Sequence, residues 1–203
     1  MDVALVGASG NVGTRILDEL VSRGHRVTAI VRRADKLTAR PGVTIKEGNA
    51  NDRKALTELL RGHDAVISAV RFMAVNPNAL LGAVKDSQVA RYLAVCGTGS
   101  LQVAPNKQLI DSERFPEAYR SEAAHDVVFL DMLRKEKTLD WTCLSPAAEF
   151  FPGERTGHFR LDSNHLVIDD HDESRISFED YALALVDELE SPRHSRERFT
   201  LGY

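Results

Sequence analysis

Apolar runs and helical patterns alternate along the first two thirds of the chain. Six short runs are nearly continuous in apolar residues, as in parallel strands covered on both faces. They are Val3–Val6, Val27–Val31, Val43–Lys46, Ala65–Val70, Tyr92–Cys96 and Trp141–Leu144. Between them, apolar positions recur at helical spacing. This spacing predicts helices at Arg15–Arg23, Arg53–Leu60, Asn78–Asp86 and about Ser121–Lys135. The alternation indicates an α/β fold with a doubly wound parallel sheet of order 3-2-1-4-5-6.

Capping residues support several of these helix ends. Gly24 and Gly62 can close the first two helices, and Asp52 can cap the start of the second. Asn76 followed by Pro77 is typical of an N-cap and a first-turn proline. In the helix near Ser121–Lys135, four apolar side chains are expected to face inward: Val127, Val128, Leu130 and Leu133.

The pattern changes after Leu144. Ser145–Asp172 contains proline, glycine and polar turns, which predict a small loop-rich C-terminal cap. Ser174–Ile176 then leads to a capping box, Ser177-Phe-Glu-Asp180, and a helix at Tyr181–Glu190. A last short strand, Arg198–Leu201, is expected to complete an edge of the sheet. We expect one domain over 1–203, with 145–203 forming the substrate-side cap and the final helix and strand.

Composition excludes several classes of protein. The chain is 43% hydrophobic and 28% charged, which is ordinary for a globular protein, and its net charge of -4 argues against a nucleic-acid binder. No apolar run reaches the roughly 18 residues of a membrane span, and Met1 leads directly into the first strand. We therefore expect a cytoplasmic protein. Cys96 and Cys143 lie in apolar strand patterns and are expected to be buried free thiols.

The most informative motif follows the first strand. Gly7-x-x-Gly10-x-x-Gly13 lies where Val3–Val6 ends and a helical pattern begins. Gly7 can form the tight turn, Gly10 lets a pyrophosphate approach the backbone, and Gly13 lets the helix pack close to the sheet. The helix N-terminus then directs free N–H groups at the phosphates. This arrangement predicts a dinucleotide site in a Rossmann-type domain, although a glycine triplet can also be a structural turn.

The end of the second strand distinguishes the two nicotinamide dinucleotides. NAD-binding domains usually place an acidic residue there, whereas this chain has Arg32 and Arg33. A guanidinium can hold a 2′-phosphate through two hydrogen bonds, so NADP(H) is preferred and NAD(H) is possible. The alternative is that both arginines are solvated residues at a helix start.

Residues after the later strands extend the candidate site. Asn49 and Ala50 follow the third strand and are expected beside the adenine, although Asn49 could be a turn residue. Ser68, Ala69 and Val70 close the fourth strand near the pyrophosphate and the nicotinamide-side ribose. After the fifth strand, Cys96 and Gly97 line the nicotinamide, and Thr98 and Ser100 supply hydroxyl groups toward the substrate or are structural loop groups.

The Tyr–Lys pair of ordinary short-chain dehydrogenases is absent. Four residues after Tyr92, Tyr119 and Tyr181 stand Cys96, Ala123 and Leu185, so the catalytic residues remain unknown. Alcohol and ketone chemistry requires such a proton donor, but reduction of a flavin or quinone can take its proton from water. The seven histidines lack a metal-ligand spacing, and no metal is expected.

Several longer motifs resemble a known family. Gly7-Ala-Ser-Gly-Asn-Val-Gly13, Asp140-Trp-Thr-Cys-Leu-Ser-Pro146 and Phe151-Pro-Gly-Glu-Arg-Thr-Gly157 are similar to the NADH-flavin reductase family. This is an atypical short-chain dehydrogenase/reductase group close to NmrA-like proteins and biliverdin reductase B. The chain departs from it at Cys96-Gly-Thr-Gly-Ser100, where relatives tend to carry Gly-Gly-Ala-x-Ser.

The resemblance implies further site residues. Cofactor contacts are implied at Ser9, Asn11 and Val12 beside Gly7 and Arg32. Pro146 would border the nicotinamide, and Phe150 and Arg155 would border the substrate. Arg155 could meet a carboxylate or phosphate, or it could pair with Glu154 and hold the loop.

The favoured function is an NAD(P)H-dependent oxidoreductase that reduces free flavin or a similar planar acceptor. Flavin is then a substrate and not a tightly bound group. The alternative is a non-catalytic, NmrA-like NADP sensor, and an epimerase or dehydratase is less favoured because it needs the Tyr–Lys pair. The expected partner is a small-molecule acceptor, with no nucleic acid and no membrane, and the chain is expected to be a monomer or homodimer.

Overall fold

A central sheet of eight strands carries the fold in the computed structural model, which describes residues 1–113 and 115–203. The strands of this sheet are β1 Asp2–Val6, β2 Arg26–Val31, β3 Val43–Glu47, β4 Ala65–Ser68, β5 Arg91–Val95, β8 Asp140–Ser145, β10 Arg160–Asp162 and β12 Glu197–Gly202. Their order is β10-β12-β8-β5-β4-β1-β2-β3. The predicted order 3-2-1-4-5-6 is confirmed by the six strands from β3 to β8, which are parallel to one another.

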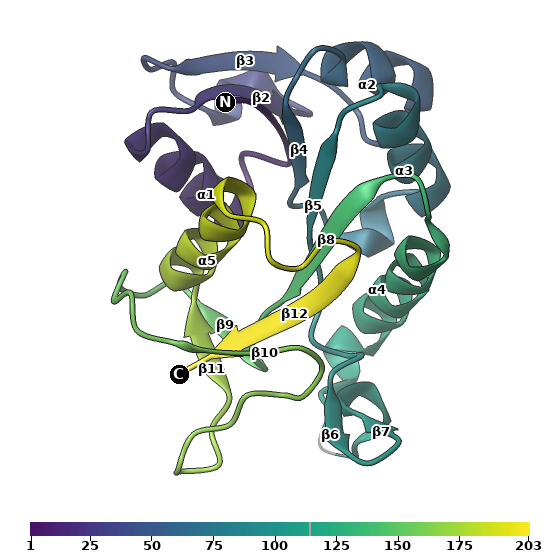
Figure 1. The fold of residues 1–203 in the computed structure, drawn as a ribbon, viewed down its shortest axis with the longest axis vertical. Coiled ribbons are helices and arrows are strands. Elements are labelled where there is room, and N and C mark those ends of the chain that lie inside the picture. Colours follow the sequence, from purple (N-terminus) through teal and green to yellow (C-terminus); the bar gives the residue numbers. More distant parts are fainter. Residues whose placement is uncertain (114) are drawn as a thin grey trace.

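Within the described residues, five α-helices cover the two faces of the sheet (Figure 1). They are α1 Asn11–Ser22, α2 Arg53–Leu60, α3 Pro77–Asp86, α4 Glu117–Lys135 and α5 Phe178–Glu190. α1 and α5 pack together on one face, and α2, α3 and α4 cover the other. Each face has its own cluster of buried apolar side chains. The Rossmann-like α/β class is thus confirmed.

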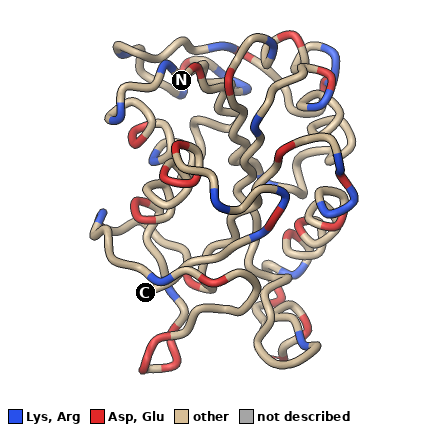
Figure 2. Tube along the Cα trace, in the orientation of Figure 1, with Lys and Arg blue, Asp and Glu red and all other residues tan. Residues whose placement is uncertain are grey.

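Short elements complete the chain. They are the 3-10 helices η1 Ala34–Lys36, η2 Phe72–Ala74 and η3 Leu109–Asp111, the hairpin strands β6 Gln102–Ala104 and β7 Lys107–Gln108, and the paired strands β9 Glu149–Phe151 and β11 Arg175–Ser177. The hairpin and most of the region after β8 lie at one end of the sheet (Figure 1). Charged residues of both signs are interspersed along the outer helices and loops, while the central strands carry few (Figure 2).

The predicted caps form as local chemistry requires. Asp52 Oδ1 accepts a hydrogen bond from Ala55 N at 3.0 Å, and Asn76 Oδ1 accepts from Asn78 N at 2.9 Å. Ser177 Oγ caps α5 by accepting from Asp180 N at 3.0 Å. The return bond of a capping box is replaced, because Asp180 instead accepts from Gly157 N at 2.8 Å and from the Tyr203 hydroxyl at 2.8 Å.

Two predictions about packing are wrong. The last strand does not form the edge, because β12 is inserted parallel to β8 and the antiparallel β10 pairs with its outer side. Val128 does not face inward and is 55% exposed. Leu130 and Leu133 face inward as predicted, but α4 begins at Glu117 and its buried stripe continues with Ala123, Asp126 and Phe129.

The expectation of free thiols is also wrong. Cys96 and Cys143 form a disulfide, with their Cα atoms 5.8 Å apart. Parallel pairing sets Ala94 beside Cys143, so Cys96 at the end of β5 lies on the same side of the sheet as Cys143 in the next strand. The apolar pattern of each strand shows burial but not which strands are neighbours.

The disulfide makes a testable prediction. It closes a loop between residues 47 positions apart, and loop-closure entropy gives it about 4 kcal/mol of unfolding free energy. Thiol titration in denaturant without reductant should find no free thiol, and titration after reduction should find two. The Cys96→Ala/Cys143→Ala variant should unfold at lower denaturant than the oxidised protein and near the reduced one. Two thiols titrating before reduction would contradict the disulfide.

Candidate functional site

In the turn between β1 and α1, the backbone packs too closely at Gly7 and Gly13 to accommodate a Cβ atom. Gly7 has φ +86°, and a Cβ there would lie 2.2 Å from the carbonyl oxygen of Ala69. A Cβ on Gly13 would lie 2.1 Å from the carbonyl oxygen of Gly7. These contacts confirm the predicted tight turn at Gly7 and the close helix packing at Gly13. They also bring Ala69, at the end of β4, against the turn.

The first turn of α1 presents its N–H groups without a protein cap. Gly10 stands at the N-cap position, and no side chain accepts a hydrogen bond from the helix start. Ser9, Gly10 and Asn11 are exposed, and Val12 is half-buried. Uncapped N–H groups and the positive end of the helix dipole attract an anion. A dinucleotide pyrophosphate fits this cradle of bare backbone.

The two arginines after β2 differ in their surroundings. Arg33 donates to Asp35 from Nε at 3.2 Å and from a terminal nitrogen at 3.3 Å. Arg32 is exposed, and in the described part of the chain its guanidinium has no hydrogen bond or ion pair. Glu47, at the end of β3, accepts a hydrogen bond from Ala34 N at 2.9 Å. Arg32 is therefore the arginine whose donors are available.

The residues expected around the adenine and ribose are only partly accessible. Asn49 is exposed, with Oδ1 accepting from Asn51 N at 3.0 Å, while Ala50 is buried. Ser68 is fully buried and its hydroxyl pairs with the Tyr92 hydroxyl at 2.7 Å, so its side chain does not face the cleft. Ala69 and Val70 are half-buried.

The segment after β5 forms the other side of the site. Thr98 is half-buried and donates to the carbonyl oxygen of Ala147 at 3.2 Å, which ties this segment to the residues after Pro146. Ser100 is 2% exposed and accepts from Arg198 at 3.2 Å. Gly97 is half-buried and donates its N–H to Asp126 Oδ1 at 2.7 Å. Of the two predicted hydroxyl groups, Thr98 is the more accessible.

The residues implied to border the substrate hold the cap in place. Phe150 packs against Phe178 and Tyr181 of α5, with ring centroids 4.6 Å and 4.8 Å away. Arg155 forms two hydrogen bonds of 2.9 Å with Glu19 on α1, so its partner is not Glu154. Pro146 is buried at the end of β8. Arg155 thus anchors the cap to the cofactor-side helix.

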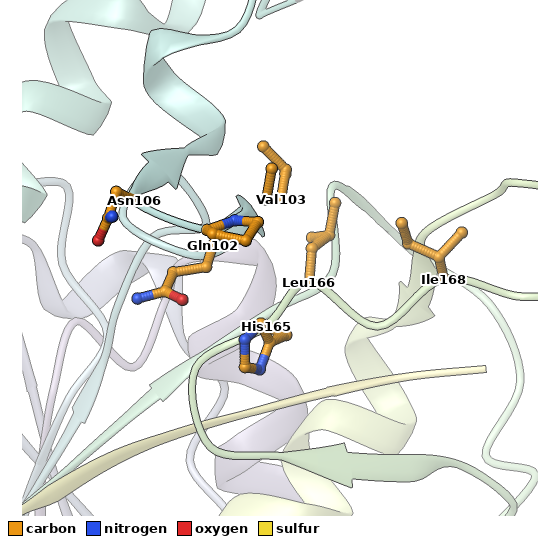
Figure 3. A pocket seen from close by; sticks show the side chains of 8 residues that line it. Gln102, Val103, Asn106, His165, Leu166 and Ile168 are labelled. Carbon is orange, nitrogen blue, oxygen red and sulfur yellow. The ribbon is translucent and has the colours of Figure 1, made fainter.

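A hollow of about 420 Å³ lies beside this end of the sheet (Figure 3). Gln102 of β6 and His165 form an isolated parallel bridge, and Leu166 N donates to the Gln102 carbonyl oxygen at 3.0 Å. The hollow is lined by the hairpin at Gln102–Asn106 and by His165, Leu166 and Ile168. Its lining is mixed, with apolar side chains beside one imidazole and two amides.

Sequence reasoning missed Asp126. Its carboxyl group is 1% exposed and faces the end of β5 from α4. Burial raises its pKa to about 6, with the Gly97 N–H and the charge of Arg198 acting in the opposite direction. A pattern in the sequence could have revealed it, because Asp126 lies three residues after Ala123 and four before Leu130, on the apolar stripe of α4.

Other chemistries find no support in the described residues. No group of three or more His, Cys, Asp or Glu is arranged to hold a metal ion there. No helix in the described ranges is long and apolar enough to cross a bilayer. Burial raises the pKa of Tyr92 and of Tyr181 above the usual range, and neither side chain reaches solvent.

Comparison with known proteins identifies the family. The model of the family described as NAD(P)H-binding matches residues 7–192, so the chain belongs to this family. The Bacillus subtilis (strain 168) protein YwnB, described as uncharacterized, is 36% identical over 208 residues, covering 99% of this chain and 98% of YwnB. The family match agrees with the predicted resemblance.

Two solved structures of high similarity carry different names. A "putative epimerase" from Bacteroides thetaiotaomicron has a TM-score of 0.95 and 40% identity, covering 100% of this chain and 96% of the other. A "putative NADH-flavin reductase" from Streptococcus pneumoniae TIGR4 has a TM-score of 0.84 and 36% identity, covering 100% and 99%. The fold and family are common to both, and the names differ in the reaction.

The glycine turn yields a prediction that separates binding from folding. A Cβ on Gly10 meets its nearest atom at 3.4 Å, so Gly10→Ala should fold with little loss of stability. Its methyl group would occupy the face offered to the pyrophosphate, and cofactor affinity should fall about tenfold or more. Gly13→Ala should instead lose about 3 kcal/mol of unfolding free energy, because its Cβ meets backbone. Denaturant melts and cofactor titration measure the two effects; equal affinity in Gly10→Ala and wild type would contradict the assignment.

The raised pKa of Asp126 should make the stability of the protein depend on pH. This pKa is about 6 in the folded protein against 3.8 for an ordinary aspartate, so the folded state favours the protonated form and the protein loses stability as pH rises through this interval. Asp126→Asn keeps an acceptor for Gly97 N and cannot ionise. Its unfolding free energy should match wild type near pH 4 and exceed it by up to about 3 kcal/mol above pH 6. A difference that does not change with pH would refute the raised pKa.

Proposed function

We propose that this protein is an NAD(P)H-dependent reductase of free flavin or a similar planar acceptor. The observation that carries the proposal is an uncapped dinucleotide cradle at α1 combined with the absence of a Tyr–Lys pair. When bound, the nicotinamide supplies a hydride, and the acceptor takes one further proton from water. The balance is NAD(P)H, acceptor and one proton giving NAD(P)⁺ and the reduced acceptor. Such a reaction depends on positioning more than on a tuned acid.

The residues of this chain have distinct tasks in the proposal. The N–H groups at 11–13 hold the pyrophosphate, because the Gly10 N–H already donates to the Gly7 carbonyl oxygen at 3.0 Å, and Arg32 holds the 2′-phosphate of NADP(H). Cys96, Gly97 and Pro146 border the nicotinamide, and Thr98 offers a hydroxyl toward the acceptor. The hollow beside Gln102 and His165 follows Thr98 and Ser100 along the chain, and its apolar, amide and imidazole side chains can contact a planar ring.

The names of the similar structures do not choose between a reductase and an epimerase, because the Bacteroides structure named as an epimerase is 40% identical to this chain. The Streptococcus structure is named for flavin reduction at 36% identity. An epimerase of this class needs the Tyr–Lys pair, and here Tyr92 and Tyr181 are fully buried while exposed Tyr119 is followed four residues later by Ala123. Reduction of an acceptor by hydride transfer is the reaction that these residues can support.

An acceptor screen tests the proposal. Purified protein should consume NADPH in the presence of FMN, riboflavin or a quinone. The absorbance of the reduced nicotinamide measures this consumption, and one molecule of reduced acceptor should form per NADPH. Gly10→Ala serves as the control for a contaminating reductase. Cofactor binding without turnover across all acceptors would reject the reductase and support the alternative, a cofactor sensor of NmrA-like type.

Arg32 gives a sharper prediction about the cofactor. Hydrogen bonds to a charged group contribute about 1.5–3 kcal/mol, so Arg32→Ala should raise the Kd for NADPH about tenfold or more. The Kd for NADH should change much less, since NADH lacks the 2′-phosphate. Arg33→Ala is the matched control, because Arg33 is already paired with Asp35. Equal losses for NADPH and NADH would show that Arg32 does not read the phosphate.

We propose the cytoplasm as the location, because the reaction consumes reduced nicotinamide cofactor; the Cys96–Cys143 disulfide counts against this location, since disulfides are rare in cytosolic proteins. The partner in this proposal is a small-molecule acceptor, with the chain acting as a monomer or homodimer. No role in binding nucleic acid or a membrane is proposed, consistent with the net charge of -4.

A further inference from the structure

Asp126 is a buried carboxyl group that lacks the partners such a group normally has. Oδ1 accepts from Gly97 N at 2.7 Å, and Oδ2 is buried without a hydrogen-bond partner in the described structure. A Cβ on residue 97 would lie 2.9 Å from Oδ2, so only glycine allows this approach. The carboxyl group therefore touches the backbone that ends β5, on the side of the sheet covered by α4.

The charged and titratable groups around Asp126 do not neutralise it directly. Glu122, on the same helix, adds a second negative charge. Arg198 of β12 attracts Asp126 but donates its hydrogen bonds to Ser100 Oγ and to Asn164 Oδ1. Tyr181 of α5 donates its hydroxyl to the carbonyl oxygen of Leu144 at 2.7 Å.

An isolated buried charge is costly, and packing does not require it. Asparagine could accept the same hydrogen bond from Gly97 without that cost. Burial sets the pKa of Asp126 at about 6, so the group changes charge near neutral pH. Carboxyl groups of this kind concentrate at functional sites.

We propose that Asp126 is a positioning residue whose negative charge, held behind the Gly97 peptide, makes the site bind the oxidised, cationic nicotinamide more tightly than the reduced, neutral one. This inference rests on the proposed function, in which Gly97 borders the nicotinamide. The two cofactor forms share the same phosphates and differ by one positive charge on the ring. A fixed charge in a buried, low-dielectric setting distinguishes them by Coulomb attraction.

The negative charge of Asp126 also assists hydride donation. The ring gains positive charge as the hydride leaves, so a negative charge nearby stabilises the transition state more than the bound reduced cofactor. Asp126 does not touch the reacting atoms and acts through the Gly97 peptide. This gives the site an electrostatic contribution that does not require a Tyr–Lys pair.

Binding linkage makes the proposal measurable. If NADP⁺ favours the ionised carboxylate, NADP⁺ must lower the pKa of Asp126 and release a proton on binding. If NADP⁺ lowers the pKa of Asp126 by one, its affinity rises about tenfold as the pH rises through the titration of this carboxyl group. NADPH affinity gains nothing by this route.

The first test is the ratio of the Kd values for NADPH and NADP⁺ from about pH 5.5 to about pH 8. The 2′-phosphate titrates near pH 6 in both forms, so the ratio cancels its effect. We expect the wild-type ratio to shift about tenfold toward NADP⁺ and the Asp126→Asn ratio to stay flat. Asp131→Asn is the matched control, an exposed carboxylate on the same helix, and should follow wild type.

The second test needs no variant. Carboxyl ¹³C NMR of the wild-type protein should give a pKa for Asp126 that NADP⁺ lowers and NADPH leaves in place. An Asp126 pKa unmoved by NADP⁺, or the same pH-dependent ratio in Asp126→Asn and wild type, overturns this inference while the proposed function stands. Failure of both cofactors to bind at millimolar concentration overturns the proposed function and the inference with it.

Discussion

The structure depends on backbone contact at the junction of β1, β4 and α1, where no Cβ can be accommodated. Gly7 lies against the carbonyl oxygen of Ala69, and Gly13 lies against that of Gly7. These contacts let α1 start directly over the end of the sheet with its N–H groups free. The central strands, with their apolar faces covered by helices on both sides, fix the position of this cradle. Binding of a dinucleotide requires the close turn, the free N–H groups and the fixed end of the sheet at one place.

The cap extends this arrangement by polar contacts instead of a second core. Arg155 binds Glu19 on α1, Thr156 and Gly157 bind Asp180, and Thr98 binds the backbone after Pro146. Segments far apart in sequence are thereby joined around the end of the sheet where the cofactor is proposed to lie. The strand insertion of β12 between β8 and β10 brings Arg198 under the same region, close enough to influence Asp126.

The chemistry that these residues allow is narrow. Tyr92 and Tyr181 are buried away from solvent, and the residues of the proposed site offer backbone N–H groups, small side chains and Thr98. A site of this kind can hold and orient a hydride donor beside a planar acceptor. The buried carboxyl group of Asp126 behind Gly97 gives the reductase proposal a charged group without assigning it a proton-transfer step.

The sequence alone determined the order of the six parallel strands from β3 to β8, the glycine turn, the caps at Asp52 and Asn76 and the pair Arg32 and Arg33 as candidate cations. These features are local, since periodicity, φ requirements and capping depend on neighbouring residues. Tertiary structure decided the disulfide of Cys96 and Cys143, the Arg155–Glu19 pair, the inward face of α4 and the placement of β12 inside the sheet. Each of these joins residues distant along the chain, and hydrophobic patterning records that a side chain is buried without recording what it is buried against.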